Sequence, residues 1–180
     1  MARTLKDANQ EIVVLRAKIK ELEELTLDDL TGLLRRKVFQ LAVEEEILRC
    51  KRSKKTFAVL VIDLNYLKTV NDTHGHQAGD QMIVSFAEFL KRNLRDCDIV
   101  ARTGGDEFMV FLPEQNAKGA NTIRRHLLET LEQATVSLPF FKGAAIGVAT
   151  YIKTSSSFQE MYKIADKAMY VHKKAMKKCA

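Results

Sequence analysis

The first 25 residues carry hydrophobic side chains at a heptad spacing. Two series of apolar residues repeat every seven positions and are offset by three: Leu5, Ile12 and Ile19, then Ala8, Leu15 and Leu22. This spacing predicts a helix with one apolar seam, as in a coiled coil. In the same register, opposite charges fall at the flanking positions of the seam. We therefore favour a parallel dimer over the alternative, an amphipathic helix packed on its own domain.

Beyond residue 26, helical and extended hydrophobic patterns alternate. A turn is expected over residues 26–32, which contain capping residues and a glycine. Amphipathic stretches predict helices at residues 35–53, 66–73, 78–92, 116–133 and 158–178. Short apolar, β-branched runs predict strands at residues 56–63, 98–102, 107–112 and 143–151. A Gly-Gly-Asp turn joins the second strand to the third as a β-hairpin. Gly75 and Gly79 are expected to punctuate the two helices that lie between the first and second strands.

Length and composition indicate one soluble domain with a short appendage. We divide the 180 residues into an N-terminal dimerisation helix, residues 1–26, and a main domain, residues 27–180, of the α+β or α/β class. No apolar run approaches the roughly 20 residues of a membrane helix, and the start is too polar for a secretory signal. Three cysteines without CxxC spacing argue against a disulfide framework. We expect a cytoplasmic protein that has no membrane partner.

The net charge is +6, and much of the excess lies at the C-terminal end. Residues 159–180 carry six lysines against two acidic residues, a patch that suits phosphates, nucleic acid or plain solvation. A second basic run, residues 51–55, contains no aromatic residue and precedes a buried strand. We interpret that run as a solvated helix end, and we expect no nucleic-acid partner.

Three carboxylates are candidates for a metal site. Asp63 ends the first predicted strand, and Asp106 and Glu107 lie at the tip of the hairpin. Converging carboxylates repel unless a cation lies between them, and Mg²⁺ prefers oxygen ligands and substrate phosphates. Gly104 and Gly105 lack a Cβ atom, so a ligand can approach their backbone, and they tolerate positive φ. The alternative is an ordinary tight turn in which the aspartate serves turn geometry alone.

Residues 104–108 read GGDEF, and this segment resembles the signature of the GGDEF family, the diguanylate cyclases. Three further segments resemble family elements in the expected order: DDLTGL at 28–33, DLNYLKTVNDTHGHQAGD at 63–80 and DKAMYVHK at 166–173. The resemblance covers roughly residues 27–178. Several positions depart from the family pattern, among them Asn65, Leu67 and Lys177, but no departure removes a metal carboxylate or a guanine-binding side chain.

The resemblance implies a palm-like α+β fold related to class III nucleotide cyclases, with a mainly antiparallel central sheet flanked by helices. It also implies that two GTP molecules are condensed into cyclic di-GMP with loss of two pyrophosphates, with Mg²⁺ or Mn²⁺ as cofactor. Each subunit would hold one GTP, so two subunits must face each other. The N-terminal seam would then hold two catalytic domains at high effective concentration, as a homodimer.

The resemblance assigns roles to individual residues. The implied metal ligands are Asp63, Asp106, Glu107 and the Leu64 carbonyl. The alternative role for Glu107 is to deprotonate the 3′-hydroxyl. Positions that contact the substrate are Lys68, Asn71, Asp80, Gly104, Gly105, Lys173 and Lys177. Among these, Asn71 and Asp80 match guanine-binding positions, and the lysines match phosphate contacts.

A second site is expected at Arg95 and Asp98, which form an RxxD motif ending shortly before the glycine pair. Its offset matches the product-inhibition site of the family, whereas a surface ion pair is the alternative. Three other functions stay open: a cyclic di-GMP receptor without turnover, a cyclase for another dinucleotide, and a pure dimerisation module. The retained Asp106 and Glu107 favour an active cyclase, and Asp80 favours guanine.

Overall fold

The computed structural model describes residues 12–18, 22, 25–53, 55–134, 138–151 and 157–179, with the backbone only for residues 177–179. Residues 12–18 are helical. The main domain then contains, in chain order, β1 (Leu34–Arg35), α2 (Arg36–Arg52), β2 (Phe57–Leu64), α3 (Leu67–His74), α4 (His76–Asn93), β3 (Ile99–Arg102), β4 (Glu107–Pro113), α5 (Ala117–Ala134), β5 (Ala144–Thr150) and α6 (Phe158–Cys179).

The strands form one five-stranded sheet in the order β1-β3-β4-β2-β5. The pairs β3–β4, β4–β2 and β2–β5 are antiparallel, and only the short β1 runs parallel to its neighbour β3. β2 lies inside the sheet and is buried along its whole length. This arrangement confirms the expected α+β class with a mainly antiparallel sheet.

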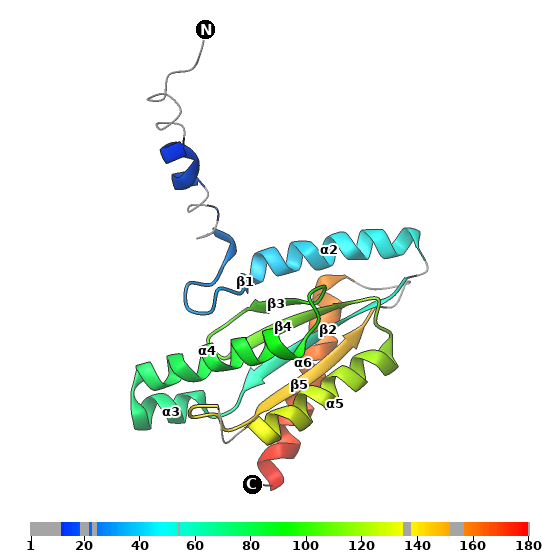
Figure 1. Ribbon diagram of the computed structural model, residues 1–180. Coiled ribbons are helices and arrows are strands. Elements are labelled where there is room, and N and C mark those ends of the chain that lie inside the picture. The colour runs from blue at the N-terminus through cyan, green and yellow to red at the C-terminus, as the bar shows by residue number, and fades with distance from the viewer. Residues whose placement is uncertain are drawn as a thin grey trace.

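Helices cover both faces of the sheet, as Figure 1 shows. Side chains alternate across a strand, so β2 contributes to two separate cores. Leu60 and Ile62 pack with residues of α4 and α5, whereas Val59 and Val61 pack with residues of α2 and α6. The domain is therefore a three-layer sandwich, and the ends of β2 emerge between its layers.

Helix α6 packs very closely on β5. A Cβ atom at Gly147 would lie 1.9 Å from the Ala165 carbonyl oxygen and 2.3 Å from the Met169 nitrogen. Gly147 therefore allows the helix backbone to touch the strand. Met161 and Met169 are buried on the inner face of α6.

Two details differ from the sequence prediction. Gly79 does not interrupt a helix but lies inside α4. The absence of a side chain makes room for Asn71 of α3, since a Cβ atom at Gly79 would lie 1.8 Å from Oδ1 of Asn71. Strand β1 was not predicted, since its two residues are extended only by pairing with β3.

The described part of the N-terminal segment agrees with the predicted helix. Ile12 and Leu15 of the seam are exposed in the single chain, together with Val13 and Val14. Leu22 of the seam is exposed as well, whereas the other seam residues, Leu5, Ala8 and Ile19, lie outside the described residues. In the part of the chain that the structure describes, no helix combines the length and apolarity needed to cross a membrane.

Candidate functional site

Two carboxylates meet at the end of strand β2. Asp63 is paired with Glu107, the first residue of β4, in the antiparallel register. By the alternation of side chains along a strand, both lie on the face of the sheet that packs on α2 and α6. Val61 and Met109 are buried on the same face. Directly opposed residues of an antiparallel pair have Cβ atoms about 4.5–5.5 Å apart. The fold thus brings two residues that are 44 positions apart in the chain side by side. The sequence predicted that these carboxylates converge but not that they are direct partners in the ladder.

The surroundings of Glu107 are negatively charged. Burial raises the pKa of its carboxyl group, and the nearby carboxylates Asp106, Asp63 and Asp166 raise it further. Arg36, at the start of α2, opposes this shift. A raised pKa means that the ionised form of Glu107 is disfavoured in the folded chain, which a bound cation would relieve.

A lysine from the last helix reaches the same place. The Nζ atom of Lys173 lies 2.5 Å from Oδ1 of Asp63, whose residue is only 8% exposed. The ammonium group therefore neutralises Asp63 in the free chain. Lys173 was expected as a phosphate contact, and in the structure its side chain extends from α6 to Asp63 near the end of β2. The side chain of Lys177 lies outside the described residues.

The hairpin tip is shaped by its two glycines. Neither Gly104 nor Gly105 has a positive φ. A Cβ atom at Gly104 would lie 3.0 Å from Oε2 of Glu107, whereas one at Gly105 would meet nothing within 4 Å. Gly104 thus makes room for the Glu107 carboxylate, and Gly105 leaves an open approach to the backbone.

Backbone hydrogen bonds join the hairpin to β2. The Leu64 amide donates to the Asp106 carbonyl at 2.9 Å, and the Thr103 amide donates to the Glu107 carbonyl at 2.9 Å. These bonds hold all four predicted metal-binding residues in one short region.

The donor set fits a magnesium ion that is completed by its substrate. Within the described residues, no group of three or more His, Cys, Asp or Glu side chains is close enough to hold a metal by itself. Mg²⁺ usually takes one or two carboxylates, waters and substrate phosphates rather than a complete protein cage. Asp63 and Glu107 would supply two carboxylates to such an ion.

A second part of the site lies where α3 meets α4. The Oδ1 atom of Asn71 is buried and has no hydrogen-bond partner in the described structure. It lies against Gly79 of α4, and the next residue, Asp80, the other predicted guanine-binding residue, is exposed. Lys68 is exposed on the preceding turn of α3. A buried acceptor without a partner is energetically costly and indicates a place for a donor.

Arg95 and Asp98 are joined to each other. The Nη2 atom of Arg95 lies 2.6 Å from Oδ1 of Asp98, and its Nε atom lies 3.2 Å from Oδ2. Both residues line a cavity of about 390 Å³ that also includes Lys91 and Leu33. The ion pair and the cavity are compatible with both interpretations of the RxxD motif, a product-inhibition site and a surface ion pair.

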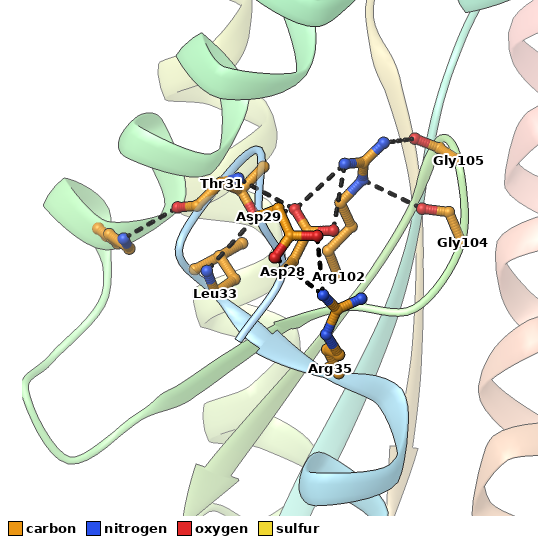
Figure 2. A network of polar contacts seen from close by, with 9 residues as sticks. Asp28, Asp29, Thr31, Leu33, Arg35, Arg102, Gly104 and Gly105 are labelled. Atoms are coloured by element: carbon orange, nitrogen blue, oxygen red, sulfur yellow. Dashed lines mark hydrogen bonds and ion pairs between the residues drawn. The ribbon is translucent and has the colours of Figure 1, made fainter. Parts of the chain in front are cut away.

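Sequence reasoning missed an arginine clamp beside the signature loop, which Figure 2 shows. Arg102 donates through Nε to the Gly104 carbonyl at 3.2 Å and through Nη2 to the Gly105 carbonyl at 3.0 Å. Its Nη1 atom lies 3.1 Å from Oδ1 of Asp28. The turn after the N-terminal helix is thereby tied to the loop that carries Asp106. The available signal was weak: Asp28 lies within the quoted DDLTGL element, and Arg102 lies two positions before the GGDEF segment.

Asp28 is held as a carboxylate in this clamp. Burial by itself would raise its pKa, but hydrogen bonds from Thr31 and Arg102 outweigh burial and lower the pKa. The Thr31 amide and hydroxyl donate to Oδ1 at 3.0 and 2.7 Å. Nearby, the exposed side chains of Arg35 and Asp29 form a separate pair.

Together the fold and the site define a class of α+β domains that combine carboxylates at a strand end with a glycine-containing hairpin at the same edge of an antiparallel sheet. Residues 25–179 match the family described as "Diguanylate cyclase, GGDEF domain". The chain belongs to this family.

Curated relatives agree with this assignment. Probable diguanylate cyclase DgcC of Escherichia coli is 34% identical over 161 residues, which are 83% of this chain and 41% of that protein. Diguanylate cyclase DosC of Escherichia coli is 31% identical over 172 residues, 92% of this chain and 37% of that protein. The chain therefore spans less than half the length of these relatives.

Solved structures show the same fold. The coiled coil and GGDEF domain of DgcB from Caulobacter crescentus, in complex with c-di-GMP, superposes with a TM-score of 0.82 at 26% identity. That match covers 95% of this chain and 93% of the other. A sensory box/GGDEF family protein from Caulobacter crescentus gives 0.73 at 32% identity, covering 83% and 98%.

Proposed function

We propose that this chain is a diguanylate cyclase that condenses two GTP molecules into cyclic di-GMP and releases two pyrophosphates. The observation that carries the proposal is the register that opposes Asp63 to Glu107 beside the open backbone of Gly105. Family membership and relatives described as diguanylate cyclases support it.

In this proposal Asp63 and Glu107 hold Mg²⁺, with Asp106 and the Leu64 carbonyl as further oxygen ligands. The bound ion would stabilise charge on the α-phosphate and favour the ionised 3′-hydroxyl. Mn²⁺, which also accepts oxygen ligands, would substitute for it. The residues themselves contribute a fixed acidic pocket, which the β2–β4 ladder keeps in register.

The base would be selected at the contact of α3 with α4. Guanine presents N–H donors. The unpartnered Oδ1 of Asn71 and the carboxylate of Asp80 can accept hydrogen bonds from them. A site built on such hydrogen bonds rejects a base that leaves buried polar groups unpaired, by a factor of about 10⁴–10⁵ in favourable cases.

Basic side chains would take the triphosphate. Lys68 approaches from α3, and Lys173 and Lys177 belong to α6. In the free chain Lys173 is bound to Asp63, so phosphate would give its ammonium group a second anionic partner when a cation occupies Asp63. Gly104 and Gly105 would lie against the nucleotide, because Gly105 has open space above it.

Two copies of the chain are required, since each domain would carry one GTP. We assign the dimer contact to the N-terminal helix, whose seam residues Ile12 and Leu15 are exposed in the single chain. Product inhibition would occur at Arg95 and Asp98, which line the cavity of about 390 Å³ beside the start of β3.

The decisive experiment incubates the purified chain with GTP and Mg²⁺ and identifies products by mass spectrometry. Asp106→Asn removes a metal ligand at constant volume, and Glu129→Gln, at an exposed position of α5, is the matched control. Cyclic di-GMP is expected from the parent and the control but not from Asp106→Asn. A dimeric parent that forms no dinucleotide would refute the proposal.

A second function, a receptor for cyclic di-GMP, is favoured by one observation. The Arg95–Asp98 pair borders a cavity and is separate from the acidic site. Calorimetric titration with cyclic di-GMP distinguishes the two functions. A receptor binds the dinucleotide without GTP turnover and loses binding in Arg95→Ala, whereas an inhibited cyclase shows turnover that Arg95→Ala relieves from inhibition.

A further inference from the structure

Strand β5 is an outer strand of the sheet, so one side of its backbone has no neighbouring strand. The Tyr151 amide donates to the Phe57 carbonyl, and the Asn65 amide donates to the Gly143 carbonyl, each at 2.9 Å. Odd-numbered residues of this segment therefore face β2. Because the direction of backbone groups alternates along an antiparallel strand, the even-numbered residues face outward.

At Ile146, the outward-facing backbone amide and carbonyl of β5 already form hydrogen bonds with side chains. Nε of Arg124, from α5, donates to the Ile146 carbonyl at 2.8 Å. The Ile146 amide donates to Nδ1 of His172, from α6, at 3.0 Å. At the next outward residue, Val148, none of the described residues donates to the carbonyl or accepts from the amide. The edge is thus capped at Ile146 and open at Val148.

A cavity of about 590 Å³ runs along the open part, between α5 and α6. Val148 and Thr150 line it from the strand, and Ile164 and Val171 line it from α6. Ile164 and Val171 are 53% and 61% exposed, although both are apolar. Seven positions apart on one helix, they lie on the same face and form an apolar ridge beside the strand edge.

The same cavity is positively charged. Arg124 and Lys167 line it, and none of its lining residues is acidic. Among the described residues, neither cation has a carboxylate within 4.0 Å. Burial lowers the pKa of Arg124, so its guanidinium is partly desolvated without a neutralising partner. An incoming carboxylate would relieve that cost.

We propose that this edge docks an extended acidic segment of a partner protein, which adds to the sheet as a strand beside β5. Its main chain would pair with Val148, its apolar side chains would cover Ile164 and Val171, and its carboxylates would reach Arg124 and Lys167. Strand addition of this kind takes affinity from main-chain hydrogen bonds and specificity from alternate side chains. The proposal does not depend on cyclase activity.

The test uses the full chain, isotopically labelled, and two capped peptides. One peptide alternates glutamate with valine, and the other alternates lysine with valine. We expect the glutamate peptide to shift the amide resonance of Val148 and to slow its hydrogen exchange. The lysine peptide should bind at least about tenfold more weakly, because like charges oppose each other at the interface.

Three variants locate the contact. Val148→Pro removes the outward donor, and proline is tolerated on edge strands where its missing N–H faces away from the ladder. Lys167→Glu reverses the charge in the cavity, and Lys163→Glu makes the same change at an exposed position of α6 that does not line it. We expect Val148→Pro and Lys167→Glu, but not Lys163→Glu, to weaken binding of the glutamate peptide.

If Val148→Pro fails to fold, the two lysine variants still test whether the glutamate peptide binds in this cavity. Equal binding of both peptides, or equal effects of Lys167→Glu and Lys163→Glu, would overturn the proposal. Protection of the Val148 amide that rises with chain concentration in the absence of peptide would overturn it too, since a second copy would then be the occupant.

Discussion

At the scale of single residues, the site is an acidic pocket whose charges are only partly balanced in the free chain. Asp63 is neutralised by Lys173, whereas the pKa of Glu107 is raised by burial and by its carboxylate neighbours. Shifted pKa values of this kind are common at functional sites, and in the proposed function a bound cation would offset the unfavourable charge of Glu107.

Glu107→Gln is expected to abolish the thermal stabilisation that Mn²⁺ or Mg²⁺ gives to the parent. Without metal, the variant should have an equal or higher free energy of unfolding at pH 7, because it no longer buries an ionised group among like charges. Differential scanning fluorimetry and chemical denaturation measure both effects, with Glu129→Gln as the control. A destabilised metal-free variant with an unchanged metal response would contradict this assignment.

The pH dependence of the parent follows from the same shift. The folded pKa of Glu107 lies above its ordinary value of 4.5, so the folded chain takes up this proton before the unfolded chain does. The Glu107 contribution to the free energy of unfolding therefore rises as pH falls through the folded pKa. Affinity for the metal falls over the same interval, and titration calorimetry at several pH values detects it.

The arginine clamp makes a second prediction at this scale. Arg102→Gln leaves the partly buried carboxylate of Asp28 without its cation and frees two carbonyls of the signature loop. Removing one member of a buried, hydrogen-bonded charge pair costs about 3–5 kcal/mol, and partial exposure here reduces that to about 1–3 kcal/mol.

The matched control is Arg35→Gln, because the Arg35–Asp29 pair nearby is exposed. Exposed pairs contribute about 0–1 kcal/mol. Urea denaturation of both variants measures the difference. Equal losses would show that the clamp does not hold the turn against the hairpin.

At the scale of elements, the close packing of α6 on β5 positions Lys173 over the sheet. The contact depends on Gly147, where an added Cβ atom would strike backbone atoms of the helix. Backbone cannot move aside as a flexible side chain can, so the helix itself would have to shift. Lys173, which lies just over two helical turns after Ala165, would shift with it.

Gly147→Ala should therefore destabilise the chain by about 1–3 kcal/mol or more, since overpacking forces backbone shifts. Gly119→Ala is the control, because its Cβ would meet only the end of the Gln115 side chain. In a helix, alanine in place of glycine gains up to about 1 kcal/mol. Thermal denaturation compares the two. A tolerated Gly147→Ala would contradict the close approach.

At the scale of the whole molecule, function is proposed to require two chains. The N-terminal helix leaves the main domain at the turn that Arg102 clamps to the signature loop (Figures 1 and 2). Its described apolar residues are exposed in the single chain. Contiguous exposed apolar residues commonly mark an interaction surface.

Glutamate at the seam positions, in the double variant Ile12→Glu/Leu15→Glu, should shift the chain towards monomer in analytical ultracentrifugation. The rate of cyclic di-GMP formation per chain should then rise with chain concentration, because the encounter of two domains becomes limiting. Val13→Glu, an exposed position off the seam, is expected to leave both unchanged. Identical behaviour of the seam and off-seam variants would rule out this dimer contact.

The sequence by itself determined the elements and the inventory of the site. Helices and strands arise from local hydrophobic periods, and the acidic, amide and basic residues were identified by motif order alone. Its misassignment was also local: Gly79 was taken for a break, because one sequence cannot show what lies opposite a missing Cβ atom.

Only the tertiary structure decided which of these residues meet. The opposition of Asp63 to Glu107 depends on strand register, and the Arg102–Asp28 clamp and the Lys173–Asp63 pair join residues 74 and 110 positions apart. Such contacts follow from how sheet and helices pack, not from any local pattern. The open edge at Val148 belongs to the same category, because strand order, rather than the strand sequence, leaves β5 without a neighbour.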